Sequence, residues 1–211
     1  MPTTIEMTAY TFQELTPKAK ERACSTLQPD HEWWDFIYDN AKEDGRELGF
    51  NIHNIYFDLS YSQGDGASWV GTVDLVKWLE KHKPEDPQAH ILAALMENDW
   101  VDAWLDIRTS NAHYSHSNTM LRSDVTIQCE DPYDTLSKGM FAGANVRMLM
   151  ESLPDSYVDG IADEALESAR DYADDIYKKL RDESEYMCSE EYIAELCDAN
   201  EYLFDENGKL V

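Results

Sequence analysis

Lysine and arginine are scarce in this sequence, with 17 basic residues against 43 aspartates and glutamates and a formal net charge of -26. A surface that binds DNA or RNA needs a basic footprint for the phosphates, so this balance excludes direct nucleic-acid binding. Repulsion argues against anionic membranes in the same way. The charge favours a basic partner, such as a nucleic-acid-binding protein, although such acidity also serves solubility alone.

Several other signals are missing. No apolar run approaches the ~20 residues of a membrane span, and the opening residues MPTTIEMTAY lack the basic and apolar regions of a secretory signal. The four cysteines form no Cys-x-x-Cys pair and no zinc-type spacing with histidine. No phosphate-binding glycine loop or nucleophile elbow occurs. We therefore expect a soluble, intracellular protein with reduced thiols and no cofactor, and we favour a non-enzymatic role.

The apolar residues, 43% of the chain, suffice for a core, and their spacing predicts an α+β fold. Alternation predicts one hairpin within residues 52–76 and another within 101–130, and the composition of residues 3–12 predicts an opening strand. We expect an antiparallel sheet of about five strands, covered by helices. Helical spacing at residues 156–187 and 189–199 adds an acidic C-terminal helical layer. We predict a core domain at residues 1–150, with residues 151–211 packed on it.

The connection SQGDG lies between the strands of the first hairpin. Gly64 and Gly66 permit positive φ, so a turn explains this stretch sufficiently. A second interpretation is that the two hairpin tips converge at one edge of the sheet. They would then bring together a metal-binding or acid–base set, namely Gln63, Asp65, His113 and His116. The alternative function is therefore a small enzyme or metal-binding protein that uses these tips.

Acidic charge is concentrated near the C-terminus, where residues 151–211 hold 19 acidic and 5 basic residues. Carboxylates recur at steps of four in the long predicted helix, which spaces them by about 6 Å along its axis. Their opposite stripe is apolar and should dock on the body. One interpretation is a solvated helix face, and the other is a partner-binding surface. The residues of that surface are Asp159, Asp163, Glu164, Glu167, Asp171, Asp174, Asp175 and Asp182.

Residues 32–71, which read EWWDFIYDNAKEDGRELGFNIHNIYFDLSYSQGDGASWVG, resemble a block in uncharacterised proteins encoded by bacteriophages. The segments YTFQELTPKAKERA and NEYLFDENGKLV resemble the ends of the same family. The resemblance implies a phage-encoded protein of the host cytoplasm and carries no catalytic residue with it. By analogy with other small acidic phage proteins, the hypothesis is an inhibitor of restriction or CRISPR defence that imitates the charge of DNA. Its partner would be a basic host protein that binds nucleic acid.

Overall fold

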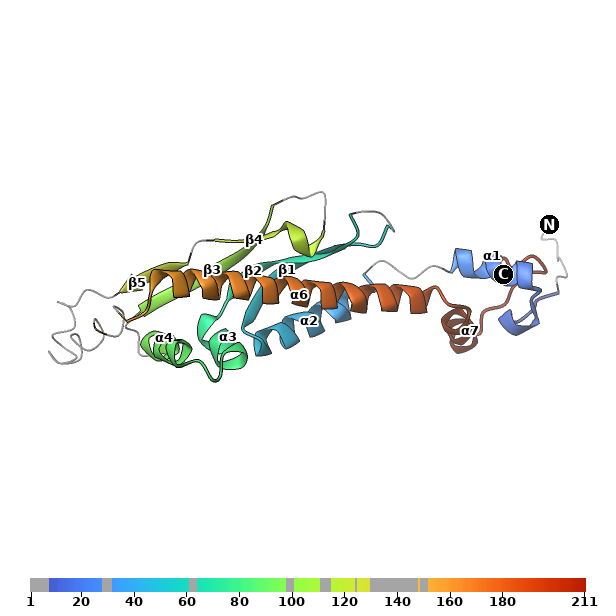
Figure 1. Cartoon of the computed structure of the whole chain (residues 1–211). Coiled ribbons are helices and arrows are strands. Elements are labelled where there is room, and N and C mark those ends of the chain that lie inside the picture. The colour runs from blue at the N-terminus through green and yellow to red at the C-terminus, as the bar shows by residue number, and fades with distance from the viewer. Residues whose placement is uncertain are drawn as a thin grey trace, which may run out of the picture. The chain divides into compact units, whose positions relative to one another are not determined.

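The computed structural model (Figure 1) describes residues 8–27, 32–60, 64–97, 101–110, 115–123, 125–129, 148 and 152–211. The chain divides into two compact units. The first, which we call the sheet unit, comprises residues 36–178, and the second, the terminal unit, comprises residues 1–35 and 179–211. The division expected from sequence, into a core domain at residues 1–150 and a packed segment at residues 151–211, stays a prediction.

The fold is α+β, as predicted. In chain order, the described elements are η1 (Phe12–Glu14), α1 (Pro17–Thr26), α2 (Asp35–Glu47), β1 (Phe50–Asp58), β2 (Gly66–Val73), α3 (Leu75–His82), α4 (Pro87–Glu97), β3 (Val101–Thr109), η2 (Ser117–Thr119), β4 (Met120–Arg122), β5 (Thr126–Cys129), α6 (Asp155–Met187) and α7 (Glu190–Ala199). No helix among the described residues is long and apolar enough to cross a membrane.

The sheet is antiparallel with the order β1-β2-β3-β4, and β5 also pairs with β3. β4 pairs with the end of β3 and β5 with its beginning. The amide of Ser123, between these two short strands, donates to the carbonyl of Asp106 (N···O 2.9 Å), so β4 and β5 follow one edge of β3. The sheet is therefore four strands wide, and both predicted hairpins are present.

Residues 8–12, the described part of the predicted N-terminal strand, do not join this sheet, so the expected width of about five strands was wrong. Residues 1–7 lie outside the described part. Tyr10 makes only an isolated bridge, to Phe204 in the terminal unit. Local capping explains why the chain leaves the extended conformation at Thr11. The side chain of Glu14 accepts hydrogen bonds from the amide and hydroxyl of Thr11, and this capping box turns the chain into η1.

Helices α2, α3, α4 and α6 lie on one side of the sheet (Figure 1). The side chains that the strands direct to this side are buried, among them Phe50, Trp69, Leu105, Ile107 and Met120. The Trp69 indole N–H donates to the carbonyl of Ala169 (3.1 Å), and the Tyr172 hydroxyl donates to the carbonyl of Ala41 (2.7 Å). These two bonds connect α6 to the sheet and to α2.

The long helix matches its prediction closely. Its expected apolar stripe is buried, at Ile161, Ala165, Ala169, Tyr172, Ile176 and Leu180. Helix α3, by contrast, was missed, because the alternating pattern predicts a strand that continues through Leu75. The strand ends at Val73, and the Asp74 side chain accepts from the amide of Lys77 (3.2 Å) as the N-cap of α3.

The terminal unit is built from both ends of the chain. Its core contains Phe12, Leu15, Ala19, Ala23, Ile193, Cys197 and Phe204. The Ser189 side chain caps α7 by accepting a hydrogen bond from the amide of Tyr192 (3.2 Å). A turn follows near residue 208, where Phe204 bridges Leu210 and Gly208 has a φ of +80°.

Candidate acidic interface

Helix α6 presents its carboxylates to solvent. It is 33 residues long, and its apolar stripe is buried, which leaves the opposite face outward. All eight acidic residues predicted for the partner surface have exposed side chains: Asp159, Asp163, Glu164, Glu167, Asp171, Asp174, Asp175 and Asp182. This exposure is what a partner-binding surface requires, and it is equally what a helix face in contact with solvent alone would show.

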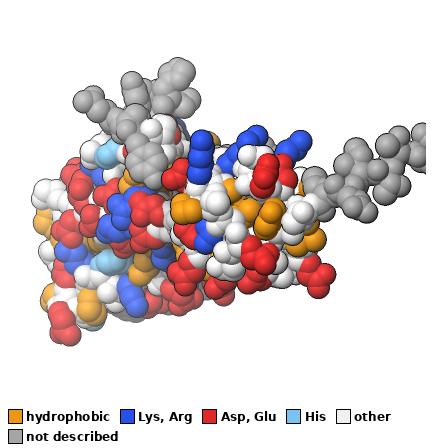
Figure 2. Space-filling model, turned by 90° about the vertical axis from the view of Figure 1, so that its right-hand side faces the viewer, with side chains coloured by type: hydrophobic (Ala, Val, Ile, Leu, Met, Phe, Trp, Pro, Cys, Tyr) orange, Lys and Arg blue, Asp and Glu red, His pale blue; other side chains and the backbone are white. Residues whose placement is uncertain are grey.

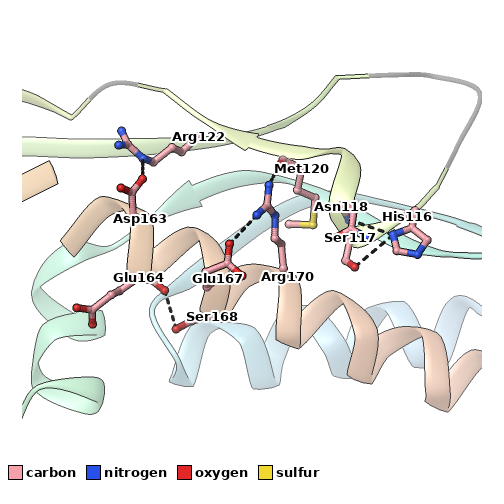
Figure 3. Close-up of polar contacts among 10 residues, drawn as sticks. All are labelled: His116, Ser117, Asn118, Met120, Arg122, Asp163, Glu164, Glu167, Ser168 and Arg170. Atoms are coloured by element: carbon pink, nitrogen blue, oxygen red, sulfur yellow. Dashed lines mark hydrogen bonds and ion pairs between the residues drawn. The ribbon is translucent and has the colours of Figure 1, made fainter. Parts of the chain in front are cut away.

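Two arginines connect this face to the sheet, Arg122 from β4 and Arg170 from α6 itself (Figure 3). The Arg122 guanidinium in β4 pairs with Asp163 (2.7 Å). Arg170 pairs with Glu167 (2.6 Å) and also donates to the carbonyl of Met120 (2.8 Å). Because both arginine side chains are mostly buried, these contacts fasten the helix to β4 as well as neutralising charge.

Three further predicted carboxylates also have cationic partners. Lys83 pairs with Glu164, Lys178 with Asp175 (2.8 Å), and Arg181 with Asp182 (3.0 Å). Pairs this exposed contribute little to stability, about 0–1 kcal/mol. They do lower the field above the helix, because each cation lies within ion-pair distance of the carboxylate that it screens.

The remaining three carboxylates of the set are the strongest candidates for contact with a partner. Asp159, Asp171 and Asp174 make no ion pair within the part of the chain that the structure describes. Sequence spacing alone did not separate these three from the paired ones. Two of the paired residues, Asp163 and Glu164, have cationic partners that are far away in sequence, on β4 and at the end of α3. The other three pair with cations of α6 itself.

Helix α2 extends the acidic surface, which sequence analysis did not predict. The Tyr172 hydroxyl is buried between α2 and α6, and this burial, together with the carboxylates of Asp44 and Asp175, raises its pKa well above the ordinary value. Carboxylates of both helices therefore lie near one tyrosine. Asp39, Glu43 and Glu47 are also exposed on α2, at steps of four, and this spacing is the signal that could have identified them. Figure 2, which faces the right-hand side of the view in Figure 1, shows that acidic side chains are also frequent there, with lysines and arginines among them.

The described residues beside the two hairpin tips lie close together. A Cβ on Gly66 would lie 3.0 Å from the Ser115 carbonyl oxygen and 3.1 Å from the His116 Cα. His116 is already engaged locally, because its Nδ1 accepts from the Asn118 amide (3.0 Å; Figure 3). Asp65 accepts from the Ser60 hydroxyl (3.4 Å).

The full predicted tip set is only partly visible, since Gln63 and His113 lie outside the described residues. Within the described residues, no group of three or more histidine, cysteine, aspartate or glutamate side chains is arranged to hold a metal ion. The tip site therefore stays a prediction.

Comparison with known families gives one match, over residues 33–190, to the Domain of unknown function (DUF8835). The chain belongs to this family. The matched region runs from just before α2 to the start of α7, so it contains both acidic helices and both hairpin tips. No curated protein and no solved structure matches the chain.

Proposed function

We propose that this protein binds a basic, nucleic-acid-binding surface of a partner protein through the acidic face of α2 and α6. In the fullest form of the proposal, it is a phage-encoded inhibitor that acts in the host cytoplasm on a bacterial defence effector. The observation that supports it most is the exposure of all eight α6 carboxylates above a completely buried apolar stripe. The resemblance to phage-encoded proteins supports the biological setting.

The physical basis is charge imitation. Carboxylates at steps of four along a helix are spaced by about 6 Å, a scale comparable to that of successive phosphates on a nucleic-acid strand. A groove that binds phosphates offers lysines and arginines at matching positions. Binding would then reduce the repulsion among the carboxylates of the acidic face. Long-range attraction between the acidic face and the basic groove would speed their association. Association should weaken strongly as salt is raised, because the Debye length falls from ~10 Å at 0.1 M to ~3 Å at 1 M.

Two triple variants with the same charge test this proposal. One replaces the carboxylates without an ion pair, Asp159→Asn, Asp171→Asn and Asp174→Asn. Its matched control replaces the paired residues Asp163→Asn, Glu167→Gln and Asp175→Asn. Both remove three negative charges and keep side-chain size. If the face binds a basic groove, the first variant should lose at least tenfold in affinity, and the control should lose less, because its carboxylates are already screened.

The measurement begins with affinity capture from bacterial lysate, using the parent and both triple variants as baits. A captured DNA-binding protein is then purified and titrated against a fluorescent DNA duplex, with the three proteins as competitors at 50 and 300 mM salt. Displacement of DNA by the parent and the control, with loss of displacement in the first variant, supports the proposal. Equal displacement by all three proteins contradicts it and leaves the α6 carboxylates as a solvated face.

A second candidate function is a small enzyme or metal-binding protein centred on the hairpin tips. The close approach of Gly66 to Ser115 and His116 favours it. Calorimetric titration with Zn²⁺ and with Co²⁺ tests the metal-binding form, with Asp65→Asn and His116→Ala as variants. Stoichiometric binding that both variants abolish supports this candidate, and absence of binding by the parent contradicts its metal form.

A further inference from the structure

The side of the sheet opposite the helices carries large, partly exposed apolar side chains. No described helix covers this side (Figure 1). Tyr56 on β1, Trp104 on β3 and Leu121 on β4 are 43%, 40% and 48% exposed. They lie on three different strands and point away from the buried face, as the alternation along each strand requires. Tryptophan and tyrosine are residue types enriched where proteins bind one another.

This outer face differs in charge from the rest of the molecule. Among the described strand side chains that point to it, the charged ones are Asp58, Asp106 and Arg108. Arg108 pairs with Asp106 two residues away on the same strand (2.7 Å). The three described charges of the outer face therefore sum to only -1, in a chain of net charge -26. Two copies of such a chain repel each other strongly wherever their acidic surfaces meet, and least where neutral faces meet.

We propose that the outer face of the sheet binds the same face of a second copy of this chain. A two-fold axis that runs in the interface plane, across β3 at the level of residue 107, reverses the strand direction of one copy relative to the other. Each Asp106 then lies over the partner's Arg108. The two aspartates and two arginines of the dimer therefore form a group of four charges in which each negative charge faces a positive one. The exposed apolar side chains pack around this centre as two sheets do, about 10 Å apart.

The size of the face sets the expected strength. Strands of nine residues at about 3.3 Å per residue, in a sheet four strands wide at about 4.8 Å spacing, present about 570 Å² per copy. Standard stable interfaces bury about 800 Å² per partner. The dimer should therefore be weak, with a dissociation constant in the micromolar range. This inference does not depend on the proposed function, since it uses the opposite side of the sheet unit from α2 and α6.

Sedimentation equilibrium of the full chain from 1 to 100 μM, at 50 and 300 mM salt, tests the proposal. We expect a monomer–dimer equilibrium that tightens at 300 mM salt, because screening reduces the repulsion between two acidic chains. This dependence is opposite to that expected for binding to a basic partner. Leu121→Glu and, separately, Arg108→Asp should each weaken the dimer at least tenfold.

The charge exchange Asp106→Arg with Arg108→Asp provides the sharpest control, because the two-fold arrangement restores the pairing and the dimer should return. Asp171→Asn on α6 should leave the dimer unchanged. Thermal melting of each variant verifies folding. A chain that stays monomeric at 100 μM and 300 mM salt overturns the proposal, as does a dimer that survives both single substitutions. Failure of the charge exchange to restore the dimer overturns the two-fold geometry.

Discussion

The two units of the molecule obtain their cores in different ways. The sheet unit buries large aromatic side chains, including Phe50, Trp69 and Trp78, that come from one continuous stretch of chain. The core of the terminal unit combines Phe12 and the small residues Ala19 and Ala23 near the start with Ile193 and Phe204 near the end. The first core lies within one stretch of chain, although it joins residues as distant as Trp69 and Ala169, whereas the second requires segments on either side of that stretch to meet. The units should therefore respond differently to damage.

The largest expected effect is the loss of a core aromatic side chain. Trp69→Ala removes a fully buried indole and its hydrogen bond to Ala169, which should cost about 3–5 kcal/mol of unfolding free energy. Phe12→Ala is its counterpart in the terminal unit. Hydrogen exchange should show the loss of protection concentrated in β1, β2 and α6 for the first variant, and in α1 and α7 for the second. Loss of protection throughout the chain in both variants would show that the two cores unfold as one.

Glycine substitutions compare close backbone contacts in the two units. A Cβ on Gly71 in β2 would lie 2.1 Å from the Asn51 carbonyl oxygen, and one on Gly208 would lie 2.0 Å from the Ala19 carbonyl oxygen. Both changes to alanine should destabilise by about 1–3 kcal/mol, measured by chemical denaturation. Gly208→Ala also strains a residue at φ +80°. The control is Gly160→Ala, because a Cβ added there would meet no described atom within 4 Å beyond the backbone of α6 itself. That change should stabilise α6 by about 0.5–1 kcal/mol.

Helix caps give an effect of intermediate size. Ser189→Ala removes the acceptor at the start of α7 in the terminal unit, and Asp74→Ala removes the acceptor at the start of α3 in the sheet unit. Each should cost about 1 kcal/mol of unfolding free energy. Hydrogen exchange of the Tyr192 and Lys77 amides should report the two losses separately. Unchanged exchange at Tyr192 in Ser189→Ala would contradict the capping role.

The smallest expected effect concerns two aspartates, one in each unit. A hydrogen bond from the Tyr157 hydroxyl (2.8 Å) lowers the pKa of Asp86, whereas backbone amides, Lys209 first, lower the pKa of Asp205. A carboxyl whose pKa is lowered on folding stabilises the fold above its unfolded pKa of about 3.9 and ceases to do so as pH falls through the folded value. Tyr157→Phe should raise the pKa of Asp86 and leave that of Asp205 unchanged, as measured by carboxyl NMR titration. A shift at Asp205, or none at Asp86, would count against this assignment.

Sequence patterns were sufficient for features that depend on neighbouring residues. The period of the apolar residues predicted α6 and α7 to within one residue at the start of each helix. Both hairpins followed from alternation and from turn residues between the strands. In each case the deciding contacts lie within a few residues of one another, so the sequence records them directly.

Features that depend on distant residues were missed. Thr-rich residues before Phe12 have strand propensity, but the described part of that segment is governed by a capping box and by a bridge to Phe204, at the other end of the chain. The partner of Asp163 was missed because Arg122, 41 residues before it, cannot be assigned to it from spacing. The acidic residues of α2 were not assigned to this surface from the sequence, because α2 and α6 are far apart along the chain. Their proximity is seen in the packing, where Tyr172 of α6 contacts Ala41 of α2.

The origin of the terminal unit from both chain ends has a consequence during synthesis. On the ribosome, α1 is made well before Ile193 and Phe204, which pack with its Ala19 and Ala23 in one core. At about 5–20 residues per second, the ~160 residues between them take about 8 to 32 s to translate. For that interval the nascent chain carries an amphipathic helix without its packing partner. The terminal unit can therefore complete its core only after the strands and helices of the sheet unit have been made.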